Sequence, residues 1–324
     1  MSSAPRAWQP AASIEALRFR AAVVSKLRTF FTQREVLEVT TPVLSAAAAT
    51  DPQIDSLSLR DARGQSWWLQ TSPEFHMKRL LAAGSGAIYQ IGPAFRGDEL
   101  GRWHNAEFSM LEWYRPGFDH HQLMDEIEAL WCMLCETEAQ AWPRYRYAAL
   151  IEQATGLSWA EACDGSKLRK ALERELGPLP VDLDTAGLLD AAMSLLVGPA
   201  LGHQQPCFVY DFPADQAALA RVETGQDGLP WASRFEWFWR GQELGNGFHE
   251  LTDAQEQARR FAADRAHRQR SAQTDVPHDE CLIAALTSGL PDCAGVAVGV
   301  DRLCALLMNA EDVSSVIAFP ADRA

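Results

Sequence analysis

Apolar and small residues alternate in the segment "AGVAVGVDRLCALL", residues 294 to 307, near the carboxyl-terminal end of the chain. Three valines fall on one face of a strand when this segment is read with a period of two, and the other face is almost bare. The valines are Val296, Val298 and Val300, and the residues of the bare face are Gly295, Ala297 and Gly299. The pattern predicts a strand with one buried face, followed directly by Asp301, Arg302 and a helix.

A helical pattern begins the chain. Apolar residues recur at helical spacing from Ile14 through Leu27 to Phe31, and Ser13 is a suitable N-cap before them. The β-branched run "VLEVTTPVL" follows and contains Pro42. Because proline is poorly tolerated in a central strand, we expect Pro42 at an edge, at a bulge or at a subunit contact.

The middle of the chain changes character twice. "WWLQTSPEFHMKRLL" predicts a strand, a turn and a helix, and "AIYQIGPAFRGDELGRWHNAEFSMLEWY" predicts two strands joined by a polar loop. Residues from about 119 to 205 indicate a helical insertion, after which strands resume in "CFVYDFP" and "SRFEWFWRGQELGNGF". Helices are expected over 253–268 and 279–289. Without regular βαβ alternation, these elements predict an α+β fold: an antiparallel sheet flanked by helices, in a single domain over 1–324.

Composition narrows the class of protein. The 324 residues carry a formal net charge of −14, which argues against tRNA or DNA as the main partner. No run approaches the ~20 apolar residues that span a bilayer, so we expect no membrane partner and a cytoplasmic protein. Seven cysteines are too few for a disulfide framework, and the Cys132-x-x-Cys135 pair lies in a predicted amphipathic helix, which favours packing over a metal or redox role.

Phosphate loops, dinucleotide-binding glycine motifs, zinc-protease motifs and nucleophile elbows do not occur in the sequence. An enzyme with this sequence would therefore work by positioning and charge neutralisation. The bare strand face could let a flat ligand lie on the backbone, with Arg302 stacked over a base or holding a phosphate. The alternative is close packing of another element on the small residues, with Arg302 in a structural salt bridge.

Two further segments bear on that choice. In "FRGDELGRWHNAEF", Arg96, Arg102 and His104 surround a hairpin that also holds Phe108, a set that suits a polyphosphate joined to a base. The alternative is an ordinary charged surface loop. In "RFEWFWRGQELGNGFHEL", Glu236 and Glu243 could hold Mg²⁺ against a nucleotide triphosphate, although paired acids on a strand are more often simply solvated.

Together these segments carry a family resemblance. The Pro42 segment, "FRGDE…HNAEF" and "GVAVGVDRL" resemble the three signature motifs of class II aminoacyl-tRNA synthetases. "TSPEFHMKRLL", "RWHNAEFSMLEWY" and "ELGNGFHELTDAQEQARRF" resemble the catalytic domain of the lysyl enzymes. The resemblance runs from about Ser13 to the end of the chain and is weakest across the helical insertion. It implies a symmetric homodimer formed through the Pro42 segment and the first helix.

The resemblance also implies roles for individual residues. Arg96 would hold the α-phosphate and the substrate carboxylate, and Phe108 and Arg302 would sandwich the adenine. The ATP-binding residues implied are Arg96, Gly97, Asp98, His104, Asn105, Phe108, Glu243, Leu244, Gly299 and Arg302. The substrate-binding residues implied are Ser72, Pro73, Glu74, Glu112, Tyr114, Asn246, Phe248, Glu250 and Ala297. The catalytic residues implied are Arg96, Glu236, Glu243 and Arg302, with Mg²⁺ held by Glu236 and Glu243.

Departures from the full-length enzymes point to a subfamily. Only about a dozen residues precede the first predicted helix, so we expect no anticodon-binding barrel. Ala297 stands where lysyl-tRNA synthetases have glycine, and its methyl group would favour a lysine whose amino group is on the β-carbon. The chain thus resembles the truncated lysyl-tRNA synthetase paralogues that activate (R)-β-lysine with ATP and attach it to a lysine ε-amine of elongation factor P. Asp98 departs from the glutamate usual in the second motif, which puts its contact with adenine in doubt.

Three other hypotheses remain open from the sequence. The chain could charge tRNA without an anticodon domain, or it could be an idle paralogue that binds a nucleotide or amino acid and regulates a partner. It could also pass the activated acyl group to a small amine. The presence of Arg96, Glu236, Glu243 and Arg302 argues against the idle paralogue, because such a protein has no chemical need for the full set.

Overall fold

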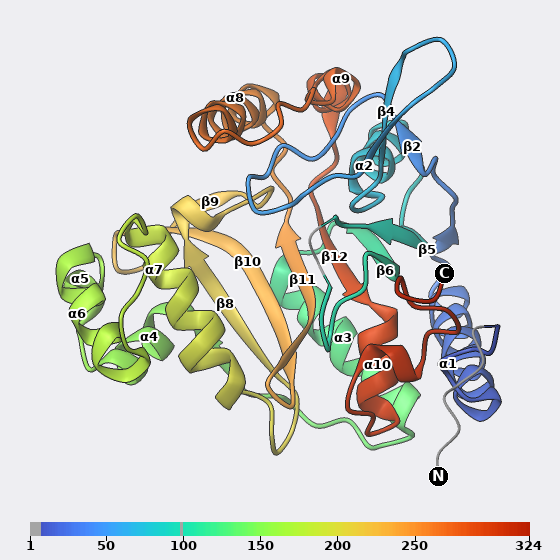
Figure 1. Cartoon of the computed structure of the whole chain (residues 1–324), viewed down its shortest axis with the longest axis horizontal. Coiled ribbons are helices and arrows are strands. Elements are labelled where there is room, and N and C mark those ends of the chain that lie inside the picture. Colours follow the sequence, from blue (N-terminus) through green and yellow to red (C-terminus); the bar gives the residue numbers. More distant parts are fainter. Residues whose placement is uncertain (1–7, 98–99) are drawn as a thin grey trace. The chain divides into compact units, whose positions relative to one another are not determined.

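The computed structural model of the chain describes residues 8–97 and 100–324 and divides into two compact units. The first unit comprises Met1–Gly117, Ala129–Thr137 and Thr252–Ala324, and the second comprises Phe118–Glu128 and Glu138–Leu251. Helix α3 (His120–Cys135) begins in the second unit and ends in the first. Both units are shown in Figure 1.

The first unit contains four strands of a mainly antiparallel sheet in the order β1-β5-β6-β12. Their bounds are β1 Leu37–Glu38, β5 Ile88–Phe95, β6 Glu107–Pro116 and β12 Cys293–Gly299. β1 runs parallel to β5, and the two other pairings are antiparallel. Glu112 of β6 lies opposite Gln90 of β5 on one side and opposite Ala297 of β12 on the other. Since residues directly opposite each other point to the same face, these three form a row.

The remaining elements of the first unit are a small antiparallel sheet, β2-β4-β3, and helices. The strands are β2 Leu44–Ser45, β3 Ser58–Arg60 and β4 Ser66–Leu69. The helices are α1 Ile14–Thr32, α2 Glu74–Ala82, α8 Ala254–Arg270, α9 Glu280–Gly289, α10 Val300–Leu307 and the 3₁₀ turn η4 Val313–Ser315. Strand β12 leads directly into α10, as the sequence predicts (Figure 1).

Helix α1 has the predicted N-cap, because the Ser13 hydroxyl accepts a hydrogen bond from the Ala16 amide at 3.0 Å. The predicted apolar face is only partly right. Leu27 and Phe31 are buried, as predicted. Ile14 is 59% exposed, however, and Phe30, which the predicted face does not include, is buried. A helix of this length offers several apolar stripes, and the position of the sheet beneath it decides which one is covered.

The second unit contains a sheet in the order β11-β10-β8-β7, with β9 paired to β10. The strands are β7 Arg144–Arg146, β8 Cys207–Pro213, β9 Val222–Thr224, β10 Pro230–Trp239 and β11 Gln242–His249. The helices are α4 Tyr147–Thr155, α5 Trp159–Ala162, α6 Gly165–Leu176, α7 Thr185–Ala192, the π-helix η1 Met193–Val197 and the 3₁₀ turns η2 Gly198–Ala200 and η3 Ala214–Gln216. The helices gather beside β8 (Figure 1), and one core holds them to the sheet, with Tyr147, Leu172 and Val209 fully buried in it.

The predicted α+β architecture is confirmed: the chain combines helices with sheets whose strands pair mostly antiparallel. The helices α3 to α7 fall within the span expected for the helical insertion, which also holds the short strand β7. The assignment of the whole chain to a single domain stays a prediction.

Two expectations concern the chain as a whole. All seven cysteines belong to the described residues and are free thiols, and Cys132 and Cys135 lie in α3 as expected. Among the described residues, no helix is both long enough and apolar enough to cross a membrane.

Candidate active site

Strand β6 brings three predicted site residues to one face of the first unit's sheet. Phe108, Glu112 and Tyr114 are separated by even numbers of residues, so their side chains point the same way. Across the antiparallel pairing with β12, Glu112 lies opposite Ala297 and Tyr114 lies opposite Gly295. The bare face of β12 therefore continues the face that carries the predicted pocket residues.

Glu112 is the most constrained of these residues. Its side chain is almost fully buried, and its two carboxylate oxygens accept hydrogen bonds from the Ser72 hydroxyl and the Tyr114 hydroxyl, each at 2.6 Å. Burial, together with the neighbouring Glu74 carboxylate, raises the pKa of Glu112 to about 7. The two hydrogen bonds fix the Glu112 side chain in position. Near pH 7 its carboxyl group is partly protonated.

Glu74 occupies the first turn of α2, whose N-cap position is taken by Pro73. Its backbone amide donates to the Ser72 hydroxyl at 3.0 Å, and its carboxylate accepts a 2.6 Å hydrogen bond from the Lys78 ammonium. Lys78 is only 1% exposed and also lowers the pKa of Glu112 through its charge. Sequence analysis missed Lys78, although its spacing of four residues from Glu74 on one helix is a signal for an ion pair.

The bare face of β12 decides between the two interpretations of that strand. Val296, Val298 and Val300 are buried, as predicted. A methyl group built on Gly299 would meet, within 4 Å among the described residues, just the Cβ atom of Arg302, at 3.8 Å. Close packing of another element would leave much less space there, so the bare face is open for a ligand at its Gly299 end.

The arginines and the histidine of the second and third motifs gather near this face. The Arg96 guanidinium lies 5.3 Å from the centre of the Phe108 ring. Arg302, in the first turn of α10, donates to the His104 imidazole at 2.9 Å and to the Trp103 carbonyl at 3.3 Å. The structure therefore brings Arg302 and His104 together, although they are far apart in the sequence.

Asn105 has contacts within the protein, and its place on the nucleotide stays a prediction. It is buried, its amide nitrogen donates to the Glu107 carbonyl at 2.6 Å, and its amide oxygen accepts from the Ala321 backbone at 2.9 Å. These bonds fasten the loop between β5 and β6 to the end of the chain. The contacts assign Asn105 to the support of this loop.

The contacts of Asp301 explain why an acidic residue precedes Arg302. Its carboxylate is buried and accepts hydrogen bonds from Arg20 of α1 at 2.9 Å and from the Ser109 backbone at 2.7 Å. Arg20 also donates to the Ser109 hydroxyl at 2.6 Å. This network ties α1, β6 and α10 together and so fixes the start of the helix that carries Arg302. No local pattern indicated that Arg20 belongs to it.

Gly97 follows Arg96 and lies against Asp55. The Gly97 amide donates to the Asp55 carbonyl at 2.9 Å, and a methyl group at Gly97 would displace the Asp55 carboxylate. The next predicted residue, Asp98, lies outside the described residues.

In the second unit, β10 and β11 hold the predicted metal ligands. Glu236 of β10 accepts a 2.6 Å hydrogen bond from Arg234, which also donates to the Asn246 side chain at 3.1 Å. Burial, with the Glu243 carboxylate as a further cause, raises the pKa of Glu236 to about 8. Sequence analysis gave Arg234 no function, and the structure shows it holding Glu236 and Asn246 together.

Three other predicted residues of the second unit are buried on or just after β11. Leu244 is 2% exposed, so any contact with a nucleotide would have to use its backbone. Phe248 packs in the core of the unit. Glu250 is 1% exposed, and its carbonyl accepts hydrogen bonds from Arg221 at 3.3 Å.

The chemistry of these donors fits magnesium. Two half-buried carboxylates that repel each other gain from a cation between them, and Mg²⁺ in nucleotide sites commonly takes one or two carboxylates and completes its shell with phosphates and water. Within the described residues, no group of three histidine, cysteine or acidic side chains could hold a metal by itself. The pair suits a metal that arrives with a nucleotide.

Comparison with known proteins shows the family of the chain. The family model described as tRNA synthetases class II (D, K and N) matches residues 8–323. The chain is 46% identical to the protein of Vibrio cholerae named elongation factor P–(R)-β-lysine ligase, over 98% of both chains. It is 45% identical, over 98% of both chains, to the protein of that name from Yersinia enterocolitica, and 47% identical to the one from Vibrio vulnificus, over 97% of this chain and 98% of that one.

The chain belongs to the class II tRNA synthetase family. Within that family, the relatives that match it over nearly their whole length are named as ligases of elongation factor P and (R)-β-lysine.

Proposed function

We propose that this protein is an ATP-dependent ligase that activates (R)-β-lysine as its adenylate and transfers it to the ε-amine of a lysine on elongation factor P. The observation that carries the proposal is the row formed by Glu112 and Ala297, which puts the substituted position of the third motif beside a buried carboxylate. The names and the nearly complete overlap of the relatives support the same activity.

Recognition of the substrate follows from the charges of the first unit. Glu74 and Glu112 are carboxylates at the same site, and a substrate with two ammonium groups gains more from them than one with a single ammonium. Ser72 and Tyr114 orient Glu112, and Pro73 begins the helix that carries Glu74. Asn246, Phe248 and Glu250 of the second unit are likewise proposed to bind the substrate.

Ala297 is proposed to distinguish the two lysine isomers. Its methyl group projects from the same face as Glu112, so it fills space next to the carboxylate that holds an ammonium group. A glycine would leave this space to an α-amino group. Moving the amino group to the β-carbon lets the substrate reach Glu112 past the methyl group.

Activation uses the arginines. The substrate carboxylate attacks the α-phosphorus of ATP, and pyrophosphate leaves. Arg96 is proposed to offset the charge that builds up on the α-phosphate, while Phe108 and Arg302 hold the adenine and His104 contacts the outer phosphates. The open space at Gly299 supports this assignment, because the nucleotide needs an unobstructed strand.

The second unit is proposed to contribute the metal ligands. Glu236 and Glu243 would hold Mg²⁺, which neutralises phosphate charge when it is bound. Arg234 orients Glu236 from the same strand. Leu244 would contact the nucleotide through its backbone.

Assembly and partners are part of the same proposal. Leu37 of β1 and Leu44 of β2 belong to the Pro42 segment and are 55% and 43% exposed, which supports a homodimer formed there. The net charge of −14 supports a protein acceptor rather than tRNA. A cytoplasmic location is proposed because translation factors act there.

ATP–pyrophosphate exchange with the purified protein tests the proposal directly. We expect strong exchange with (R)-β-lysine, weak exchange with α-lysine, and a mass increase of elongation factor P by one β-lysyl group when the factor is added. Preference for α-lysine with charging of tRNA would instead favour a synthetase, and the absence of exchange with either isomer would favour the idle paralogue.

A further inference from the structure

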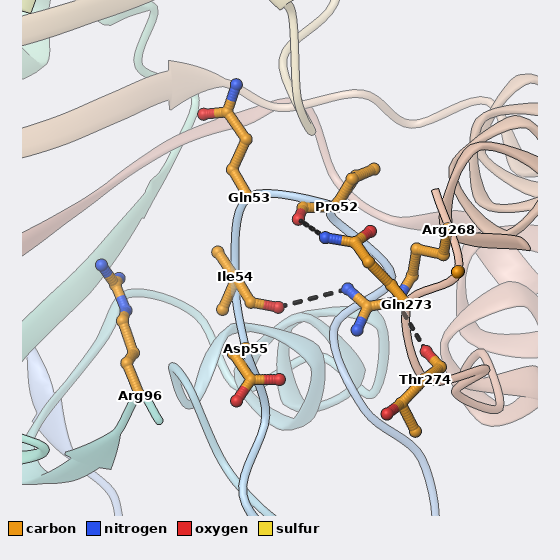
Figure 2. Close-up of a pocket in the computed structure, with 9 residues that line it drawn as sticks. Pro52, Gln53, Ile54, Asp55, Arg96, Arg268, Gln273 and Thr274 are labelled. Carbon is orange, nitrogen blue, oxygen red and sulfur yellow. Dashed lines mark hydrogen bonds between the residues drawn. The ribbon is translucent and has the colours of Figure 1, made fainter. Parts of the chain in front are cut away.

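A pocket of about 550 Å³ lies in the first unit, and Arg96 forms part of its wall. Figure 2 shows Arg96 on one side, segment 52–55 next to it, and Arg268, Gln273 and Thr274 on the other side. The lining residues are Pro52, Gln53, Ile54, Asp55, Arg96, Arg268, Ala272, Gln273 and Thr274. The volume lies in the range of about 300–1,000 Å³ that is usual for small-molecule sites. Apart from Arg96, none of these residues has a role in the activation step.

The walls of this pocket are held by hydrogen bonds to the backbone. Arg268 is 2% exposed and donates to the carbonyl oxygens of Thr274 at 2.9 Å, Asp51 at 3.0 Å and Ile54 at 3.3 Å. The Gln273 amide donates to the Pro52 carbonyl at 2.9 Å. Figure 2 shows these bonds joining segment 52–55 to the segment after α8. Arg268 is therefore occupied in shaping the pocket.

Asp55 brings a carboxylate to the pocket next to Arg96. Its carbonyl accepts a hydrogen bond from the Gly97 amide, and its side chain lies directly over the Gly97 α-carbon, one residue from Arg96. The residue is exposed to solvent. Within the part of the chain that the structure describes, no hydrogen bond or ion pair occupies the Asp55 carboxylate.

The combination of surfaces in this pocket suits an amine on an aliphatic chain. Pro52, Ile54 and Ala272 offer apolar surface, and Asp55 offers a carboxylate. A lysine side chain buries its methylene groups against apolar surface and keeps its ammonium at a polar partner. An anionic ligand would meet the Asp55 carboxylate, and the Arg268 donors it would need already serve backbone carbonyls.

We propose that this pocket receives the lysine side chain of the acceptor protein and that Asp55 accepts a proton from its ammonium. The inference rests on the function proposed above, in which Arg96 lies at the α-phosphate, the atom group to which the acyl carbon is joined in the adenylate. A pocket walled by Arg96 lies next to that carbonyl carbon. The positive charge of Arg96 also favours the neutral form of an amine beside it.

The transfer step balances with groups already named. The acceptor ammonium gives one proton to Asp55, and the nitrogen lone pair then forms the bond to the carbonyl carbon. The bond between that carbon and the phosphate oxygen breaks, and AMP leaves with the electron pair. The nitrogen loses its second proton to water, which leaves a neutral amide, and Asp55 releases its proton to solvent.

Asp55→Asn tests the proposal, because it keeps the shape of the side chain and removes the base. Two rates are measured on the same preparations: ATP–pyrophosphate exchange with (R)-β-lysine, and single-turnover transfer from preformed adenylate to elongation factor P. We expect the ratio of transfer to exchange to fall at least tenfold, and Asp55→Glu to restore part of it. Asp182→Asn removes an exposed carboxylate of the second unit and serves as the matched control.

Hydroxylamine distinguishes proton transfer from a general disturbance of the site. It attacks the adenylate as a neutral nucleophile, so Asp55→Asn should react with it as the unchanged protein does. Equal transfer to elongation factor P by Asp55→Asn would overturn the proposal. Parallel loss of exchange, hydroxylamine reaction and transfer would also overturn it, because Asp55 would then act through Arg96. Failure of the unchanged protein to catalyse exchange would instead refute the proposed function itself.

Discussion

Lys78 and Glu74 provide the sharpest test of how the first unit's pocket is built. The Lys78 side chain is 2% exposed, the Glu74 side chain is 15% exposed, and their charged atoms are 2.6 Å apart. Lys78→Met keeps the length of the side chain and removes its charge. Breaking one side of a buried pair costs about 3–5 kcal/mol, because the other charge stays buried without it. Since Glu74 keeps some contact with water, we expect the lower limit, about 3 kcal/mol.

A double-mutant cycle measures the pair itself. Lys78→Met and Glu74→Gln each leave one charge behind, whereas the double variant removes both. We therefore expect the double variant to be more stable than the sum of the single effects indicates, by about 1.5 kcal/mol or more. The free energies of unfolding come from urea titrations followed by circular dichroism and tryptophan fluorescence. Additive effects of the two substitutions would refute the argument that the pair is coupled.

An exposed pair provides the control for this cycle. Lys167 and Glu161 are 3.4 Å apart, and their side chains are 51% and 46% exposed. Water and salt weaken such a pair, so the same substitutions there should show no measurable coupling. Coupling of equal size in both pairs would mean that burial has no part in the effect.

Further predictions concern Glu112, Ala297 and Asp301. Because Glu112 must ionise to bind an ammonium and its pKa is about 7, KM for (R)-β-lysine should rise about fivefold from pH 7 to pH 6, and Glu112→Gln should abolish this dependence. The raised pKa of Glu112 also affects stability, because the contribution of Glu112 to the free energy of unfolding decreases as the pH rises from 4.5 to about 7. Urea titrations of Glu112→Gln should not show this decrease. Ala297→Gly should shift exchange toward α-lysine by at least about tenfold, the effect of one methyl group in a tight pocket, and an unchanged ratio would deny Ala297 a role in specificity. Asp301→Asn should lower the free energy of unfolding by about 2–3 kcal/mol, because Arg20 loses its buried partner, and it should raise KM for ATP through Arg302; a normal urea midpoint would contradict the first effect.

Local patterns were sufficient for the fold wherever one residue type repeats with a clear period. The alternation of Val296 and Val298 with small residues predicted β12 and its buried face correctly, and Ser13 predicted the start of α1. Val300 was assigned to the same strand, but it is the first residue of α10. The buried stripe of α1 was harder to predict. Ile14 is exposed and Phe30 is buried because the sheet under the helix, rather than helical periodicity alone, selects the stripe.

Partners that are distant in the sequence were beyond the reach of those patterns. Arg20 and Asp301 form their ion pair across almost the whole chain, and nothing near either residue indicates the other. The pairing of Ala297 with Glu112 likewise depends on the register of β12 against β6. The family resemblance suggested that Ala297 lines the pocket, but only the register puts its methyl group beside a particular carboxylate.

Charge shows the same limit at the candidate site. Glu74 and Glu112, taken from the sequence alone, favour a substrate with two ammonium groups. That argument does not include the positive charge of Lys78. In the structure Lys78 forms an ion pair with Glu74 and so neutralises the charge of that carboxylate. Glu112 holds a proton near neutral pH because it is buried next to Glu74. A substrate ammonium binds to the ionised form of Glu112. It therefore competes with the proton that Glu112 holds. Selection of a diamine then depends on how easily Glu112 gives up its proton, and burial and Lys78 control that property in opposite directions.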